Sequence, residues 1–134
     1  MSCSSGLYAA NRSTQVIPEG VPTVVDFGQI VRRFGCQINM SGGNVSILSG
    51  GYYDMDANFT FTATAGEVRI QLFQNGAPIP GAYAAVTAAA DTMYAVSIPD
   101  IVKNTCCSEE TITAVVTSDS EVTISNAAIK IEKI

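Results

Sequence analysis

The segment YDMDANFTFTAT (residues 53–64) decides the fold class of this chain. Apolar and polar residues alternate along all twelve positions, which is the pattern of a long, half-buried β-strand and has no helical interpretation. One face carries Tyr53, Met55, Ala57, Phe59, Phe61 and Ala63, and the other carries Asp54, Asp56, Asn58, Thr60, Thr62 and Thr64.

Shorter strands follow from the same reasoning on either side of this segment. After the turn at Ala65-Gly66, Val68, Ile70 and Leu72 share one face, and Asn75-Gly76 closes that strand. We therefore expect a core that contains Tyr53, Met55, Phe59, Phe61, Val68, Ile70 and Leu72. Further strands are predicted at 22–27, 44–48, 93–98, 111–117, 121–125 and 126–134.

Prolines and alanines make two segments harder to interpret. Residues 77–81 hold two prolines and are predicted to be a crossing loop or a sheet edge. Pro99 is expected to end the strand at 93–98. Propensity alone makes the alanine-rich residues 82–90 a helix, but in a β-rich chain we favour a small-residue strand and a loop.

The composition agrees with an all-β protein. The chain has 13 Val and 13 Ile against 3 Leu, and β-branched side chains pack well on pleated sheets. Its 134 residues fit one domain. The sequence therefore predicts an eight-stranded antiparallel jelly roll over residues 21–134.

The first 20 residues are predicted to be an N-terminal arm outside this domain. They are rich in Ser, Gly and Asn, and their apolar residues are few: Leu7, Tyr8, Val16 and Ile17. A flexible leader is one interpretation, and an arm that docks on a partner through these four residues is the other.

Charge and residue content exclude several function classes. The net charge of −5 provides no basic patch for nucleic acid, and no apolar stretch is long enough for a membrane helix. The chain has no histidine, which removes the usual nucleophile–base arrangements and imidazole metal sites. We expect no enzyme activity and no cofactor.

Cysteines and paired carboxylates are the remaining candidate sites. Cys3, Cys36, Cys106 and Cys107 contain no C-x-x-C pair, so a metal site is not expected, and free thiols are favoured over disulfides. Asp54 and Asp56 project from one face of a strand. We favour a solvated or subunit-facing polar face, although several copies of the pair could meet around an ion in a symmetric oligomer.

The segment GGYYDMDANFTFTATAGEVRIQLFQNGAPIPGAYA (residues 50–84) and the closing NAAIKIEKI (residues 126–134) resemble the TNF-like jelly roll. The motifs in these two segments, and their order along the chain, more particularly resemble those of small proteins of Firmicutes and their phages. The resemblance implies a homotrimer in which one sheet of each subunit packs about a threefold axis. The chain has no collagen-like stalk, which favours a capsid-bound protein over a filament tip.

The resemblance thus implies a non-enzymatic virion structural protein that decorates a phage capsid or forms a head-fibre tip. Its partners would be two further copies of the chain and a capsid or other virion protein, with no nucleic acid and no membrane. The alternative is a module that binds host-surface glycans, on a phage or on a bacterial cell or spore surface.

Overall fold

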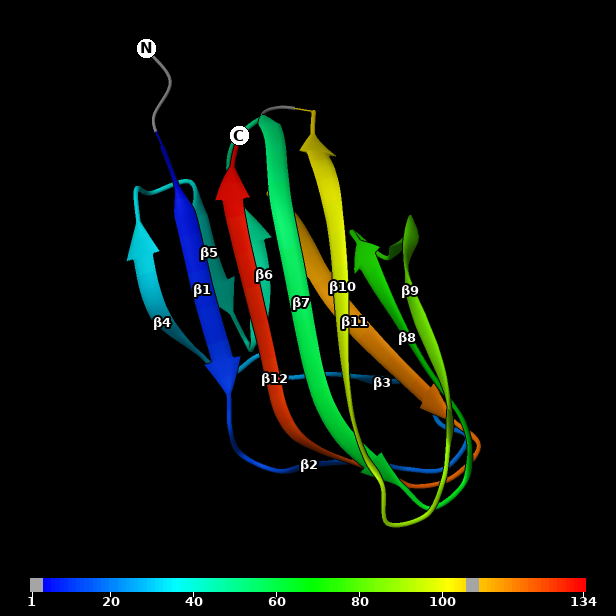
Figure 1. The fold of residues 1–134 in the computed structure, drawn as a ribbon. Helices are drawn as coiled ribbons and strands as arrows, with labels where there is room; N and C mark the ends of the chain where they lie inside the picture. Colours follow the sequence, from blue (N-terminus) through cyan, green and yellow to red (C-terminus); the bar gives the residue numbers. More distant parts are fainter. Residues whose placement is uncertain (1–3, 106–108) are drawn as a thin grey trace.

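The computed structural model describes residues 4–105 and 109–134 as a sandwich of two antiparallel β-sheets, without a helix among them (Figure 1). All strand pairs between these residues are antiparallel. The strands are β1 (Gly6–Asn11), β2 (Gln15–Ile17), β3 (Thr23–Val24), β4 (Gln29–Phe34), β5 (Ile38–Ser41), β6 (Asn44–Ile47), β7 (Gly51–Ala63), β8 (Gly66–Gln74), β9 (Ala77–Ala88), β10 (Met93–Asn104), β11 (Glu110–Ser118) and β12 (Val122–Lys133).

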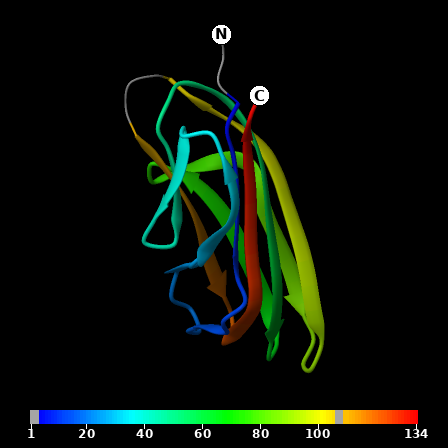
Figure 2. The same cartoon turned by 90° about the vertical axis from the view of Figure 1, so that its left-hand side faces the viewer.

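Each sheet draws its strands from distant parts of the chain. The first sheet has the order β10-β7-β12-β1-β4, and β2 also pairs with β12. The second has the order β5-β6-β11-β8-β9, and β3 also pairs with β11. Figure 2 looks at the sandwich from the side of β4. The two sheets together form the jelly roll that the alternating segments predicted.

The core lies between the two sheets and is built on the alternating strand β7. Tyr53, Met55, Phe59 and Phe61 are each at most 1% exposed, and Phe59 contacts Phe27 with ring centroids 5.8 Å apart. The Tyr53 hydroxyl donates to the backbone carbonyl of Ser49 over 2.8 Å, so this ring is buried without leaving its polar group unpaired. From β8, Val68, Ile70 and Leu72 complete the predicted set, and all are buried.

The N-terminal segment is part of the fold, which corrects the prediction of an arm at residues 1–20. Strand β1 lies between β12 and β4, and β2 pairs with β12 through Ile17. Leu7 is 3% exposed and Ile17 is 1% exposed. The prediction failed because a strand of small residues such as Ala9 and Ala10 has little apolar character of its own. Its burial comes from its two neighbours.

The loop into β4 also differs from the prediction of a strand at 22–27. Regular pairing is confined to Thr23–Val24. At Asp26 the side-chain amide of Gln15 takes the place of a neighbouring strand: its oxygen accepts from the Asp26 amide over 2.9 Å, and its nitrogen donates to the Asp26 carbonyl over 2.8 Å. Strands β4 and β5, at residues 29–41, were not predicted.

Prolines do not end the strands where the sequence suggested. Strand β9 begins at Ala77 and includes Pro78 and Pro80, so the edge interpretation is the right one and the crossing loop is wrong. Strand β10 continues through Pro99 to Asn104. Both strands are sheet edges, where one row of backbone N–H groups has no strand to bond and a proline costs no ladder hydrogen bond.

The remaining predictions concern the second half of the chain. In the alanine-rich segment 82–90, residues 82–88 belong to strand β9 and do not form a helix, as favoured. The two strands predicted at 121–125 and 126–134 are one strand, β12, with a bulge between Ile124 and Asn126. This bulge keeps Ala127, Ile129 and Ile131 on the core side after the shift in register.

Candidate functional site

The outer face of the first sheet, formed by the side chains of β10, β7, β12, β1 and β4 that point away from the core, is the candidate interaction face. The exposed large apolar side chains on strands gather on this sheet. They are Tyr8, Val16, Ile30, Val31, Phe34, Tyr52, Met93 and Ile101, whereas the second sheet has Val24 and Tyr83. Ile30 pairs with the buried Ala9 and lies on the core side of the edge strand β4, whereas Tyr8, Phe34, Tyr52, Met93 and Ile101 lie on the outer face. An outer face with this much apolar surface in water is typical of an interaction surface.

The strand register arranges this face in rows. One row across the five strands holds Pro99, Asp56, Lys130, Tyr8 and Arg32. The next row holds Ile101, Asp54, Glu132, Gly6 and Phe34. Carboxylates therefore lie on β7 and β12, and the outermost strand β4 brings an arginine and an aromatic ring.

Asp54 and Asp56 lie side by side on β7, as the alternation predicted, and share one cation. The ammonium of Lys130 on β12 is 3.9 Å from an Asp54 oxygen and 4.0 Å from an Asp56 oxygen. All three side chains are partly exposed, so this is a surface ion-pair cluster that contributes little to stability. In the described part of the chain no three Cys, Asp or Glu side chains are grouped so that they could hold a metal ion.

At the opposite margin of the face, an aromatic groove runs between β1 and β4. A Cβ at Gly6 would lie 2.4 Å from the ring of Phe34, so the missing side chain of Gly6 is what lets this ring lie on the sheet. Phe34 is 53% exposed and Tyr8 is 41% exposed. Arg32 and Lys130 also line this shallow groove of about 140 Å³. Arg32 forms no ion pair with a described residue, and its guanidinium donates to the Val31 carbonyl over 3.1 Å.

The four residues predicted to bind a partner divide into two kinds. Leu7 and Ile17 lie in the core and cannot reach a partner while the chain is folded. Tyr8 lies on the candidate face, and Val16, on β2, is 54% exposed. Alternation along β1 explains the division for Leu7 and Tyr8, because neighbouring residues of a strand point to opposite faces.

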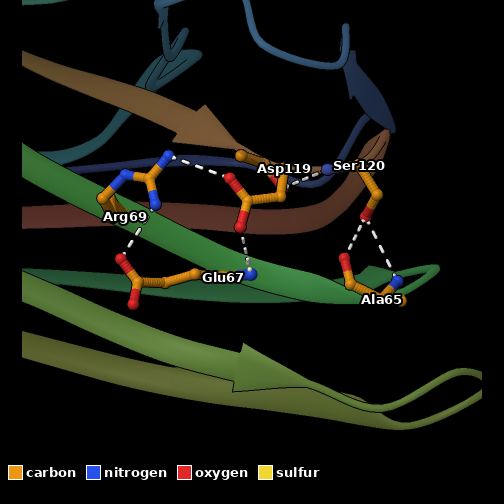
Figure 3. A network of polar contacts seen from close by, with 6 residues as sticks. Ala65, Glu67, Arg69, Asp119 and Ser120 are labelled. Carbon is orange, nitrogen blue, oxygen red and sulfur yellow. Dashed lines mark hydrogen bonds and ion pairs between the residues drawn. The ribbon is translucent and has the colours of Figure 1, made fainter.

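A second polar cluster, at the turns that end β7 and β11, has a structural role (Figure 3). Arg69 donates to Glu67 over 2.8 Å and to Asp119 over 3.3 Å, and the Glu67 amide donates to Asp119 over 3.1 Å. The Ser120 hydroxyl bonds both backbone groups of Ala65. The cluster therefore links the 65–66 turn, between β7 and β8, to the 119–120 turn, between β11 and β12; at each of these turns the chain passes from one sheet to the other.

Electrostatics agree with this fastening. The backbone hydrogen bond from Glu67 and the side-chain bond from Arg69 hold the pKa of Asp119 below its usual range. Hydrogen bonds to Glu67 and Asp119 raise the pKa of Arg69. Gly66 has a φ of +84°, and a Cβ there would lie 2.7 Å from the Asp119 Cβ, so the turn requires glycine.

Sequence reasoning missed two functional features. Residues 29–34 of β4 gave no signal because all six are exposed and the strand has no apolar face to alternate with a polar one. The second feature is Asp100 of β10, whose two carboxylate oxygens are buried without a hydrogen-bond partner among the described residues. It was missed because Pro99 was expected to end the strand before it. Cys36 is exposed in the β4–β5 turn and forms no disulfide with a described residue, and Cys3, Cys106 and Cys107 lie outside the described residues.

Comparisons with known proteins bear on the fold. No protein-family model and no curated protein matches the sequence. Among solved structures, murine APRIL at pH 5.0 matches with a TM-score of 0.77 and 14% identity, over 98% of this chain and 100% of APRIL. The Eiger TNF of S. frugiperda matches with a TM-score of 0.67 and 9% identity, over 98% of this chain and 91% of that one.

A vertex protein belongs to the same group of matches. The PRD1 vertex protein P5 matches with a TM-score of 0.65 and 15% identity, over 97% of this chain and 96% of that one. Identities this low establish architecture and leave activity open. The chain has the TNF-like jelly-roll fold.

Proposed function

We propose that this chain is a non-enzymatic structural protein of a virion, and that it assembles as a homotrimer through the outer face of its first sheet. The observation that carries the proposal is the concentration of exposed apolar side chains on that face, where Tyr8, Phe34 and Ile101 lie among partly exposed charges. Burying such a surface against copies of itself removes it from water.

Charge on the two margins of the face supports a head-to-tail contact between copies. Asp54 and Asp56 lie on β7, beside the β10 edge, and Arg32 lies on β4, at the other edge. A cyclic oligomer joins two different patches of neighbouring subunits, so opposite charge at the two margins suits this geometry. The number three comes from the resemblance to TNF-like jelly rolls.

The virion role rests on two supports. One is the similarity in fold to a protein named as the PRD1 vertex protein P5. The other is the resemblance of residues 50–84 and 126–134 to small proteins of Firmicutes and their phages. A chain that is 14% charged and rich in Val, Ile and Thr suits a durable exposed module. We therefore place it on a phage capsid or at the tip of a head fibre, with a capsid protein as its partner.

The test is electron microscopy of particles purified with and without this chain. The proposal expects additional threefold-shaped density on the outside of particles that contain the chain, and loss of that density when it is deleted. The glycan-binding alternative uses the same groove of Tyr8 and Phe34 and expects retention on host-surface polysaccharide. Particles with identical outer density in both preparations would contradict the proposed role, and so would a chain found on cell or spore surfaces only.

A further inference from the structure

Asp100 is a carboxylate in an unusual position on the edge strand β10. The register pairs it with Met55, and its side chain lies on the core side of β10, the side of Ile98 and Val102, which are both 2% exposed. Both carboxylate oxygens are buried, and neither has a hydrogen-bond partner among the described residues. A buried carboxylate with no partner is costly when it is ionised.

The surroundings of Asp100 offer it no compensating cation. Strand β9 packs beside β10 and carries no charged residue. On β7 the nearby charged groups are Asp54 and Asp56, which share Lys130 of β12. On β10 itself, the ammonium of Lys103 lies 5.6 Å from the centre of the Tyr52 ring. At the second sheet, Glu110 is bonded to Gln74.

Strand β10 is fastened to the second sheet at two places, and Asp100 lies between them. Near one end of β10, the Ala89 amide donates to the Tyr94 hydroxyl over 2.9 Å. Near the other end, the Gln74 side chain donates to the Lys103 carbonyl over 2.9 Å. Beside this second hydrogen bond, a cavity opens between the two edge strands. It is lined by Ile79, Pro80, Ile101 and Val102. The contact between the edge strands β9 and β10, here called the seam, is therefore held by hydrogen bonds near both of its ends. The unpartnered carboxylate of Asp100 lies on β10 between these two hydrogen bonds.

We propose that Asp100 is a pH-sensitive latch, which holds β10 closely against the second sheet when its carboxyl group is protonated and loosens the seam when the group ionises. Protonation removes the buried charge and turns one oxygen into a donor. Ionisation adds a third negative charge beside Asp54 and Asp56. The inference concerns the single chain and stands or falls separately from the proposed assembly.

The pKa of Asp100 agrees with this geometry and gives the pH range. Burial first, and the negative charges of Asp56 and Asp54 after it, raise the pKa from 3.8 to about 6. A carboxyl group whose pKa is higher in the folded than in the unfolded chain stabilises the fold fully below the unfolded pKa. That stabilisation is lost as the pH rises through the folded pKa, so the latch releases between about pH 4 and 6.

The test compares the wild-type chain with Asp100→Asn, which keeps the shape and removes the titration. Amide hydrogen exchange is measured on β10 at pH 4 and 7 and corrected for the intrinsic rate. We expect protection of β10 in the wild type to fall by about tenfold over this range relative to Asp100→Asn. Glu19→Gln, an exposed site, is the matched control and should follow the wild type.

A second measurement keeps the inference testable if Asp100→Asn does not fold. The carboxyl carbon of Asp100 in the wild-type chain is titrated by NMR and should show a midpoint near pH 6. Asp56→Asn should lower that midpoint, because it removes a neighbouring negative charge. A wild-type midpoint near 4 would overturn the latch. So would β10 protection with the same pH dependence in the wild type and in Asp100→Asn.

Discussion

Strands β7 and β4 belong to the same sheet and differ in almost every other respect. β7 lies between β10 and β12, and its buried and exposed residues alternate over its whole length. β4 lies at the edge, pairs with β1 alone among the described strands, and exposes all six of its residues. The comparison shows that β7 reveals its place in the core by its alternation, whereas β4 has no alternation to read. An edge strand can instead present apolar and charged groups to a partner.

The largest expected effect comes from removing β1, which pairs with β4 on one side and with β12, the neighbour of β7, on the other. Deletion of residues 1–20 removes β1 and β2, leaves β4 without its neighbour and uncovers Ile129 and Ile131 of β12. We expect a chain that no longer folds, measured by loss of the β-sheet circular dichroism signal and of a cooperative thermal transition. A truncated chain with an unchanged thermal transition would contradict this expectation and support the interpretation of residues 1–20 as an arm that the domain does not need.

The next largest effect is expected from substitutions on β7, which test whether its alternate residues are buried. Phe59→Ala or Phe61→Ala should lower the free energy of unfolding by about 3–5 kcal/mol, because each ring is 1% exposed in a packed core. Urea denaturation measures this change. Thr60→Ala, on the outer face of the same strand, is the control and should cost less than about 1 kcal/mol. Equal costs at Phe59, Thr60 and Phe61 would contradict the alternation.

The smallest effect concerns the turn between β11 and β12. Asp119 has a lowered pKa in the fold, so its contribution to stability is present above its usual pKa of 3.8 and is lost as the pH falls through the folded pKa. Asp119→Asn should therefore lower the melting temperature slightly at pH 7, approach the wild type at pH 2.5, and so flatten the loss of thermal stability below about pH 4. Melting temperatures from pH 2.5 to 7 test this, and a parallel curve for the variant contradicts it.

The parts of the fold that could be predicted from the sequence are those that alternate as β7 does. Residues such as Phe59, Ile70 and Leu72 alternate with polar neighbours because one side faces the core, so their burial could be predicted. Leu7 and Ile17 are equally buried, but each stands beside another apolar residue, Tyr8 or Val16, instead of alternating with polar ones, and the sheet that encloses them forms only through distant β12. At Asp26 a side-chain amide replaces a strand, which no periodicity reveals.

The candidate site was less predictable than the fold. Asp54 and Asp56 could be placed on one face from their spacing, but the distance to Lys130 depends on a register between strands about 75 residues apart in the chain. The groove at Phe34 depends on Gly6 in another strand. Asp100 is conspicuous only when its burial and its missing partners are known.

The measurement that tests the central claim most directly is the mass of the purified chain in solution by light scattering. The proposed assembly predicts about three times the chain mass of 14.0 kDa at micromolar concentration. Arg32→Glu, on the exposed face of β4, should shift that mass toward the monomer and leave the urea transition of the monomer nearly unchanged. Thr113→Glu, on the second sheet, is the matched control and should keep the trimer mass. A wild-type chain with a mass of 14.0 kDa at micromolar concentration would contradict assembly through the first sheet.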